Sequence, residues 1–341
     1  MSEVLVHILR GGLVESVHRG DIAVTDGEGN LLAKVGDENR RTFTRSAIKS
    51  WQALALFTLW PEAVDIFTLE ERGVMLASHS GEPKHTAAVN SILEKVDLSE
   101  SDLKCGTHPP IHTETYYEMI RNGEETNQLH CNCAGKHAGM LALCRHMGWD
   151  VEGYLEYTHP VQVEVLKIIE KLTDIPAPDV DATTDNCSVP TFHIPLKEMA
   201  TGMARLTTPE KYFADDENFV AACKLLVGTF HPAAYYIGGT GRFCTDFNGA
   251  GVGRYVGKVG GEGVYLAGLP GNDRGIAVKI DDGDRGTRAY GPAVVEVLKQ
   301  LGALTDEDME KLKKYHDAPI YNFRNIHIGM ITCNFQLEWM S

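Results

Sequence analysis

The chain has 341 residues, of which 43% are hydrophobic and 23% are charged, and these proportions are ordinary for a globular protein. They exclude a disordered chain, a collagen and a long coiled coil. Lysine and arginine number 32 against 47 aspartates and glutamates, so the formal net charge is −15. Because that sign repels phosphate backbones and anionic lipid, we expect no nucleic-acid partner and no membrane partner.

The N-terminal segment lacks the basic and small-residue features of a secretory signal, and we expect it to form a strand. No apolar run reaches the roughly 18–20 residues that span a bilayer, since the most apolar stretch, 47–60, contains Lys49 and Gln52. We therefore expect a cytoplasmic protein. The eight cysteines are scattered from Cys105 to Cys333, so in a reducing compartment they stay free or bind metal.

The first 35 residues alternate in polarity and carry strand-forming residues, with a turn at 26–30, which predicts an antiparallel meander. The apolar segment 46–60 predicts a buried helix that ends before Pro61. The middle of the chain predicts further helices at Leu69 to Ala77, His85 to Lys95, Lys136 to Met147, Val161 to Leu172 and Asn218 to Leu226.

Residues 238–282 are rich in glycine and predict strands at 263–267 and 275–280, followed by an amphipathic helix over about 289–301. Strands at both ends of the chain with helices between them favour an α+β fold. The N- and C-terminal segments would complete one antiparallel sheet packed against a mostly helical middle. We expect a single domain over 1–341, with a sheet part at about 1–45 and 235–341 and a helical part at about 46–234.

Ser46 and Lys49 form a Ser-x-x-Lys element, which on a helix places a hydroxyl and an amine on one face. A serine becomes a good nucleophile when a neighbouring base takes its proton, and a desolvated lysine can be that base. A second match, Ser101 to Lys104, lies in a polar stretch where lysine stays charged. The alternative is that Lys49 extends from the helix start to solvent.

Two further segments carry polar groups of interest. Residues 78–82 end a helical run with Ser78, which either lines a cleft or belongs to a capped turn. Lys258 precedes a glycine-rich turn where a ligand could approach the backbone, or it is a solvated lysine.

Cysteines and basic groups gather at 130–140 and 185–190, but neither segment has the Cys-x-x-Cys spacing of a zinc finger. Cys133 and Cys187 could join in a split metal site. The alternative is a set of buried, inert thiols.

Together these motifs resemble the L-asparaginase family typified by the inducible rhizobial enzymes, which is unrelated to the bacterial type I/II and plant-type asparaginases. The resemblance covers most of the chain in order, and its blocks are 44–49, 77–82, 133–141, 159–162, 185–190 and 258–282. This family is similar in fold to serine β-lactamases and glutaminases, whose Lys-Thr-Gly strand element resembles 258–260. Residues 332–341 match nothing in the family pattern.

The resemblance implies two catalytic Ser/Lys tandems, Ser46 with Lys49 and Ser78 with Lys258. It also implies a homodimer, substrate contacts from Arg45, His137 and Asp185, and a zinc site made by Cys133, Lys136 and Cys187. The sequence departs from the family pattern beside this site at Cys131, Ala134 and Asn186.

The predicted function is an amidohydrolase that converts L-asparagine to L-aspartate and ammonia through a serine acyl-enzyme. Ser46 would attack with Lys49 as base, and the zinc would not generate the nucleophile. Two alternatives stay open: another Ser-x-x-Lys hydrolase acting on glutamine, an ester or a β-lactam, and a zinc-holding protein without activity.

Overall fold

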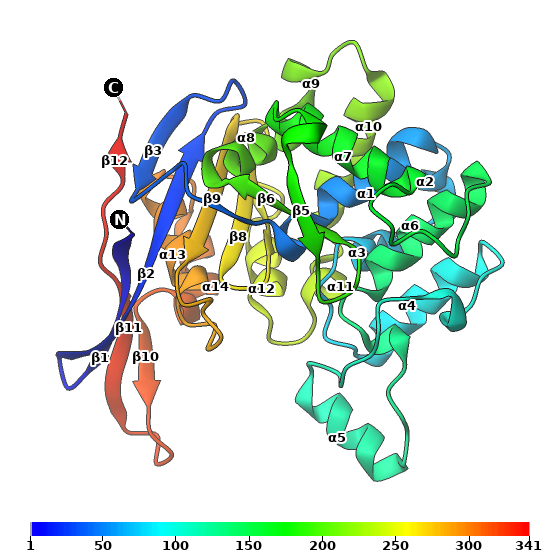
Figure 1. The fold of residues 1–341 in the computed structure, drawn as a ribbon. Coiled ribbons are helices and arrows are strands. Elements are labelled where there is room, and N and C mark those ends of the chain that lie inside the picture. The colour runs from blue at the N-terminus through cyan, green and yellow to red at the C-terminus, as the bar shows by residue number, and fades with distance from the viewer. Residues whose placement is uncertain (1, 341) are drawn as a thin grey trace. The chain divides into compact units, whose positions relative to one another are not determined.

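Strands from both ends of the chain form one antiparallel sheet in the computed structural model, which describes residues 2–340 (Figure 1). The sheet order is β10-β11-β1-β2-β9-β8-β7, and β3 pairs with β2 and β12. The strands are β1 (Glu3–Arg10), β2 (Leu13–Thr25), β3 (Leu31–Val35), β7 (Val256–Val259), β8 (Val264–Leu269), β9 (Arg274–Ile280), β10 (Ala318–Tyr321), β11 (His327–Cys333) and β12 (Glu338–Trp339). The predicted α+β class and terminal sheet are thereby confirmed.

The chain divides into two compact units. Unit 1 comprises Met1–Ala47, Ile194–Thr208 and Ala250–Ser341, and unit 2 comprises Ile48–His193 and Pro209–Gly249. Besides the sheet, unit 1 holds β4 (Arg41–Phe43), α8 (Leu196–Thr207), α13 (Tyr290–Gln300) and α14 (Asp306–Leu312). The expectation of one domain over the whole chain stays a prediction.

Helix α8 belongs with the sheet although it comes from the middle of the chain. A Cβ built on Gly275 of β9 would stand 1.8 Å from the carbonyl oxygen of Ala200 in α8. The helix and the strand therefore meet backbone to backbone, which only glycine allows at this position. Segment 235–249, predicted as part of the sheet region, is helical and lies in unit 2.

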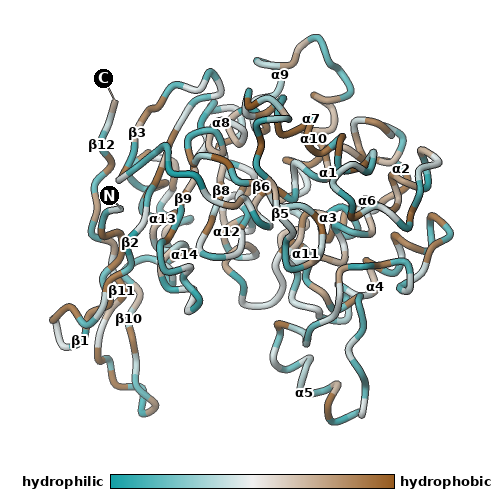
Figure 2. The backbone as a smooth tube through the Cα atoms, in the orientation of Figure 1, coloured by the Kyte–Doolittle hydropathy of each residue, from teal (hydrophilic) through white to brown (hydrophobic). Residues whose placement is uncertain are grey.

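Unit 2 is mostly helical, and its hydrophobic helices are visible in brown at α7 and α10 (Figure 2). Its helices are α1 (Lys49–Leu59), α2 (Ala63–Ile66), α3 (Leu69–Met75), α4 (Pro83–Glu94), α5 (Thr113–Asn122), α6 (Ala134–Met147), α7 (Pro160–Thr173), α9 (Pro209–Tyr212), α10 (Glu217–Phe230), α11 (Ala234–Gly238) and α12 (Phe243–Ala250). In unit 2, β5 (Asp181–Thr184) pairs antiparallel with β6 (Pro190–Pro195).

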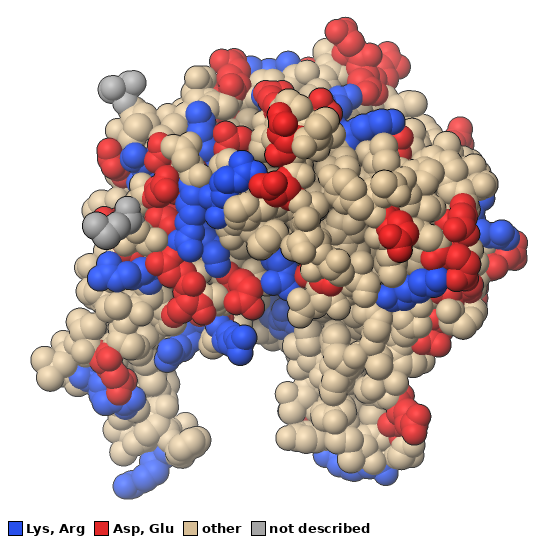
Figure 3. Space-filling model, viewed as in Figure 1, with Lys and Arg blue, Asp and Glu red and all other residues tan. Residues whose placement is uncertain are grey.

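Acidic and basic side chains are interspersed over the face of the molecule drawn in Figure 3. Within residues 2–340, none of the helices has the length and apolarity needed to cross a bilayer.

Candidate functional site

Lys49 is the first residue of α1, and its side chain is fully buried in unit 2. Its Nζ contacts three oxygen atoms: the carbonyl oxygen of Ala77, the carbonyl oxygen of Asn132 at 3.2 Å and Ser78 Oγ at 3.2 Å. An ammonium group would donate to all three. A neutral amine would donate to the two carbonyls and accept the Ser78 hydroxyl proton, so this set of partners suits both protonation states.

Ser46 lies in unit 1, in a short 3₁₀ turn at Arg45–Ile48 that precedes α1. The predicted start of an α-helix at this serine was therefore wrong, because Ala47 N–H donates to the Thr44 carbonyl three residues back. The turn ends at Ile48, and α1 begins at Lys49.

Arg45 has a left-handed backbone, with φ of 49°. Such strain in a residue other than glycine is frequent at functional sites. A Cβ at Gly261 would lie 3.0 Å from the Arg45 guanidinium carbon, and one at Gly260 would lie 3.0 Å from the Thr44 carbonyl oxygen. The glycine turn after β7 therefore packs against the segment that carries Ser46, within unit 1.

Lys258 is buried in β7, and its Nζ donates to the carbonyl oxygen of Val259 at 2.7 Å. Ser78 is buried in unit 2, where its backbone N–H donates to the Ile237 carbonyl oxygen at 3.1 Å. Ser78 Oγ lies 3.2 Å from Lys49 Nζ. The tandem assignments, Ser46 with Lys49 and Ser78 with Lys258, stay predictions.

Cys133, Lys136 and Cys187 lie close together in unit 2. Cys133 precedes α6, Lys136 lies in its first turn, and Lys136 Nζ is 3.0 Å from Cys187 Sγ. Hydrogen bonds from the Cys131 and Cys187 thiols hold the pKa of Cys133 well below its ordinary value. Burial opposes the charge of Lys136, but electrostatic interaction with the Cys187 and Cys133 sulfur atoms raises its pKa above the ordinary value.

Two thiolates are ligands that zinc accepts and hard cations avoid, whereas the Lys136 amine, whose pKa is raised, would have to lose its proton before it could join them. Among the residues that the structure describes, no three His, Cys, Asp or Glu side chains are grouped to hold a metal ion. The resemblance names two thiols, Cys133 and Cys187, and its third donor is the Lys136 amine. Zinc binding by these three residues stays a prediction.

Asp185 and Cys187 lie on a tight loop between β5 and β6. Asp185 N–H donates to the Val189 carbonyl oxygen at 2.8 Å, and Ser188 N–H donates back to the Asp185 carbonyl oxygen at 2.9 Å. Ser188 adopts a left-handed backbone with φ of 76°. A groove of about 610 Å³ borders this loop and is lined by Tyr157, Thr184 and Ser188 among others. The loop therefore holds the Asp185 carboxylate half-buried beside the thiol–amine cluster.

His137 is fully buried in α6, and its Nδ1 lies 2.7 Å from the Tyr154 hydroxyl oxygen. Sequence reasoning missed Tyr154, which no motif marks. It also missed the Asn132 carbonyl oxygen, which accepts from Lys49, although Asn132 lies inside the block 130–140 that the sequence singled out. The available signal was that a residue lies in a segment where several polar, basic or cysteine side chains are close together in the sequence.

The comparison with protein families places this chain in a class, that of the asparaginase-type amidohydrolases. The chain belongs to the L-asparaginase II family, whose sequence model matches residues 6–333. This confirms the resemblance to an asparaginase family. A search of curated proteins finds no match to the chain.

Three solved crystal structures of a protein called Mglu are similar at 15% identity. The first covers 84% of this chain and 67% of its own with a TM-score of 0.36. The match to Mglu in its native form covers 84% of this chain and 64% of the Mglu chain, with a TM-score of 0.41. The match to Mglu in its tris and glutamate form covers 89% of this chain and 64% of the Mglu chain, with a TM-score of 0.38. The chain thus spans about two thirds of the length of these structures.

Proposed function

We propose that this protein hydrolyses the side-chain amide of L-asparagine to give L-aspartate and ammonia through a serine ester. The family is the first support. The observation that carries the mechanism is the buried amine of Lys49, held by two carbonyls and one serine hydroxyl. A buried lysine with a serine hydroxyl at 3.2 Å is the arrangement that activates a nucleophile, and here that hydroxyl belongs to Ser78, whereas Ser46 is assigned as the nucleophile from the family resemblance.

In the first half-reaction Ser46 Oγ bonds to the amide carbon while its proton passes to the neutral Nζ of Lys49. The tetrahedral intermediate then collapses, and the amide nitrogen leaves as ammonia after taking that proton. The C–N bond is broken and an ester to the serine remains. In the second half-reaction water attacks the ester and releases L-aspartate and the free serine. Ser78 and Lys258 relay protons or position the water.

Ser78 is the competing nucleophile, because its hydroxyl is the one in hydrogen-bond contact with Lys49. If Ser78 is acylated, Lys49 takes the proton of the Ser78 hydroxyl, and the leaving amide nitrogen receives that proton as before. Mass spectrometry of the trapped acyl-enzyme separates the two serines.

Free asparagine is a zwitterion, so its site needs a cation for the carboxylate and an anion for the ammonium. Arg45 and Asp185 have those charges and are assigned these roles, with His137 as a third contact. The strained backbones at Arg45 and at Ser188, next in the loop after Cys187, support placing binding groups in these two segments.

Zinc, if bound, is held by Cys133, Lys136 and Cys187. The ion would supply positive charge that fixes the 185–190 loop and raises substrate affinity, while the serine remains the nucleophile. We further propose a homodimer and a cytoplasmic location, which follow from the family resemblance and from the cysteine usage.

The decisive experiment is to measure ammonia release by the purified protein from L-asparagine and from L-glutamine, with a chromogenic β-lactam as a third substrate. We expect asparagine to give the highest kcat/KM. Faster turnover of glutamine or the β-lactam would overturn the substrate assignment in favour of another Ser-x-x-Lys hydrolase. No turnover of any of them, with zinc bound, would favour a non-enzymatic zinc-holding protein.

A further inference from the structure

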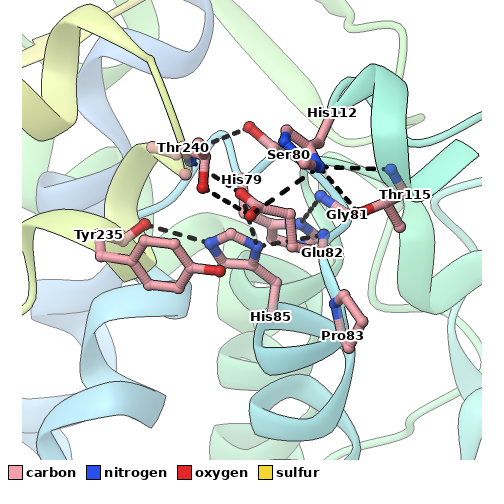
Figure 4. A network of polar contacts seen from close by, with 12 residues as sticks. His79, Ser80, Gly81, Glu82, Pro83, His85, His112, Thr115, Tyr235 and Thr240 are labelled. Carbon is pink, nitrogen blue, oxygen red and sulfur yellow. Dashed lines mark hydrogen bonds and ion pairs between the residues drawn. The ribbon is translucent and has the colours of Figure 1, made fainter.

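His79 follows Ser78 directly, and its imidazole is fully buried in unit 2. The backbone N–H of Gly81 donates to His79 Nδ1 at 3.2 Å, as Figure 4 shows. A ring nitrogen that accepts an N–H carries no proton of its own, so the hydrogen of this imidazole is on Nε2. Within the part of the chain that the structure describes, Nε2 has no hydrogen-bond partner.

The neighbouring His85 shows what a purely structural imidazole looks like here. It stacks on His79 with ring centres 5.2 Å apart and an interplanar angle of 12°. Its Nδ1 accepts the Glu82 N–H at 3.2 Å, and its Nε2 lies 3.1 Å from the Tyr235 carbonyl oxygen (Figure 4). Both nitrogens of His85 are therefore satisfied, and the stacking fixes the orientation of the His79 ring.

His137 repeats the pattern of His79. The backbone N–H of Lys104 donates to the Tyr154 hydroxyl oxygen at 2.9 Å, which leaves the Tyr154 O–H to donate to His137 Nδ1 at 2.7 Å. The His137 proton then lies on Nε2, which has no partner within residues 2–340. A buried N–H without an acceptor costs free energy, so two such groups point to an oxygen ligand.

Both imidazoles lie within electrostatic range of Lys49. Burial, with the charges of His85 and Lys49, holds the pKa of His79 well below its ordinary value. The neutral His79 imidazole thus presents an N–H donor near the amine that we propose as the base.

Of the polar groups of asparagine, the carboxylate and the ammonium have Arg45 and Asp185, and the reacting amide oxygen has no donor. We propose that His79 donates its Nε2–H to the amide oxygen of the bound substrate, with His137 as the second donor. This inference rests on the proposed function. Because the amide oxygen gains negative charge when the serine attacks, such donors stabilise the transition state more than bound asparagine.

The test compares two substitutions at one position. His79→Asn keeps an acceptor for the Gly81 N–H and removes the donor, while His79→Gln places an amide N–H close to the position of Nε2. We expect His79→Asn to lower kcat/KM for asparagine by about 10²–10³-fold, mostly in kcat, and His79→Gln to lose less. As a matched control we choose His18→Asn, since His18 is also buried with an unpartnered Nε2 but lies in β2 of unit 1. Its kcat/KM should stay within about twofold of wild type.

Nitrogen-15 NMR of the histidine side chains tests the donor without relying on turnover. We expect His79 to be the Nε2–H tautomer in the free protein, and its Nε2–H resonance to move when L-aspartate is added, while that of His85 stays. A Nδ1–H tautomer at His79, or a kcat/KM for His79→Asn within threefold of wild type, overturns this inference alone. Failure of the wild-type protein to release ammonia overturns the proposed function, and the tautomer measurement still decides whether His79 presents a donor.

Discussion

The amine of Lys49 is the residue on which the proposed chemistry depends most directly. Lys49→Met keeps the apolar stem and deletes the base, so we expect kcat/KM for asparagine to fall by at least about 10²-fold. The matched control is Lys104→Met, which alters the other Ser-x-x-Lys match. Lys104 pairs with the exposed Glu152 carboxylate at 2.5 Å, and its loss should leave kcat/KM nearly unchanged. Equal activity of the two variants would contradict a role for Lys49 in proton transfer.

The two candidate serines differ in how they relate to that amine. We expect Ser46→Ala to lower kcat by about 10⁴-fold or more with the fold intact, because it removes only one oxygen atom from a half-buried position. Ser78→Ala should slow the reaction less and allow an acyl-enzyme to accumulate. An acyl adduct found on Ser78 would reverse the two roles.

The thiol–amine cluster gives a metal prediction. Purified protein should contain about one zinc per chain, and Cys187→Ser should lose it because one of two thiolates is removed. Cys223→Ser, at a buried cysteine in α10, is the control and should retain zinc. Metal analysis by mass spectrometry gives the ratio, and a wild-type value below about one zinc per two chains would reject the site.

At the scale of elements, the close contact of α6 with α3 is made possible by a glycine. A Cβ on Gly135 would lie 2.1 Å from the carbonyl oxygen of Val74, so Gly135→Ala must push the two helices apart. We expect a loss of about 1–3 kcal/mol in the free energy of unfolding, measured by urea denaturation. Gly228→Ala in α10 is the control, since a Cβ there meets nothing within 4 Å. That variant should be unchanged or more stable by up to about 1 kcal/mol; similar losses in both variants would refute the packing argument.

Sequence patterns located most elements because polarity periods and turn residues act locally. The meander at the N-terminus, the helix after Lys49 and the glycine-rich strands all follow from such patterns. The 3₁₀ turn at Arg45–Ile48 did not, because the apolar run continues through it although the backbones of Arg45 and Ile48 depart from α-helical geometry. The Tyr154–His137 contact joins residues 17 positions apart through a loop, and hydrophobic periodicity carries no information about such a pair.

At the scale of the whole molecule, the chain passes between its two units four times, at 47/48, 193/194, 208/209 and 249/250. Reading the sequence in contiguous blocks placed α8 with the helical part, because α8 is a short excursion into unit 1 within a longer unit 2 block. Segment 235–249 was placed with the sheet part, because the second unit 2 segment continues to Gly249, beyond the predicted boundary at about 235. Neither unit is a continuous segment, so we expect the two units to be expressible only together.

The pH dependence of stability can be argued from a buried carboxylate in unit 1. Burial opposes the charge of Glu296, but a hydrogen bond from His316 Nε2 at 2.6 Å and one from Gln300 Nε2 at 2.8 Å lower its pKa below the ordinary value. The unfolded chain therefore binds a proton at this residue at higher pH than the folded protein does. The stabilisation is complete above the unfolded pKa of about 4.3 and is lost as pH falls through the folded pKa.

We expect the urea midpoint of the wild-type protein to fall between pH 6 and pH 3.5, and that of Glu296→Gln to fall less over the same interval. The glutamine keeps an acceptor for Gln300 and removes the titrating group, so other acid-sensitive pairs, such as Asp308 with Arg254 at 2.5 Å, contribute equally to both proteins. The difference between the two pH profiles isolates the Glu296 contribution. Parallel profiles would mean that His316 and Gln300 do not hold the carboxylate in its charged form, and acid sensitivity would then have to arise from carboxylates elsewhere in the chain.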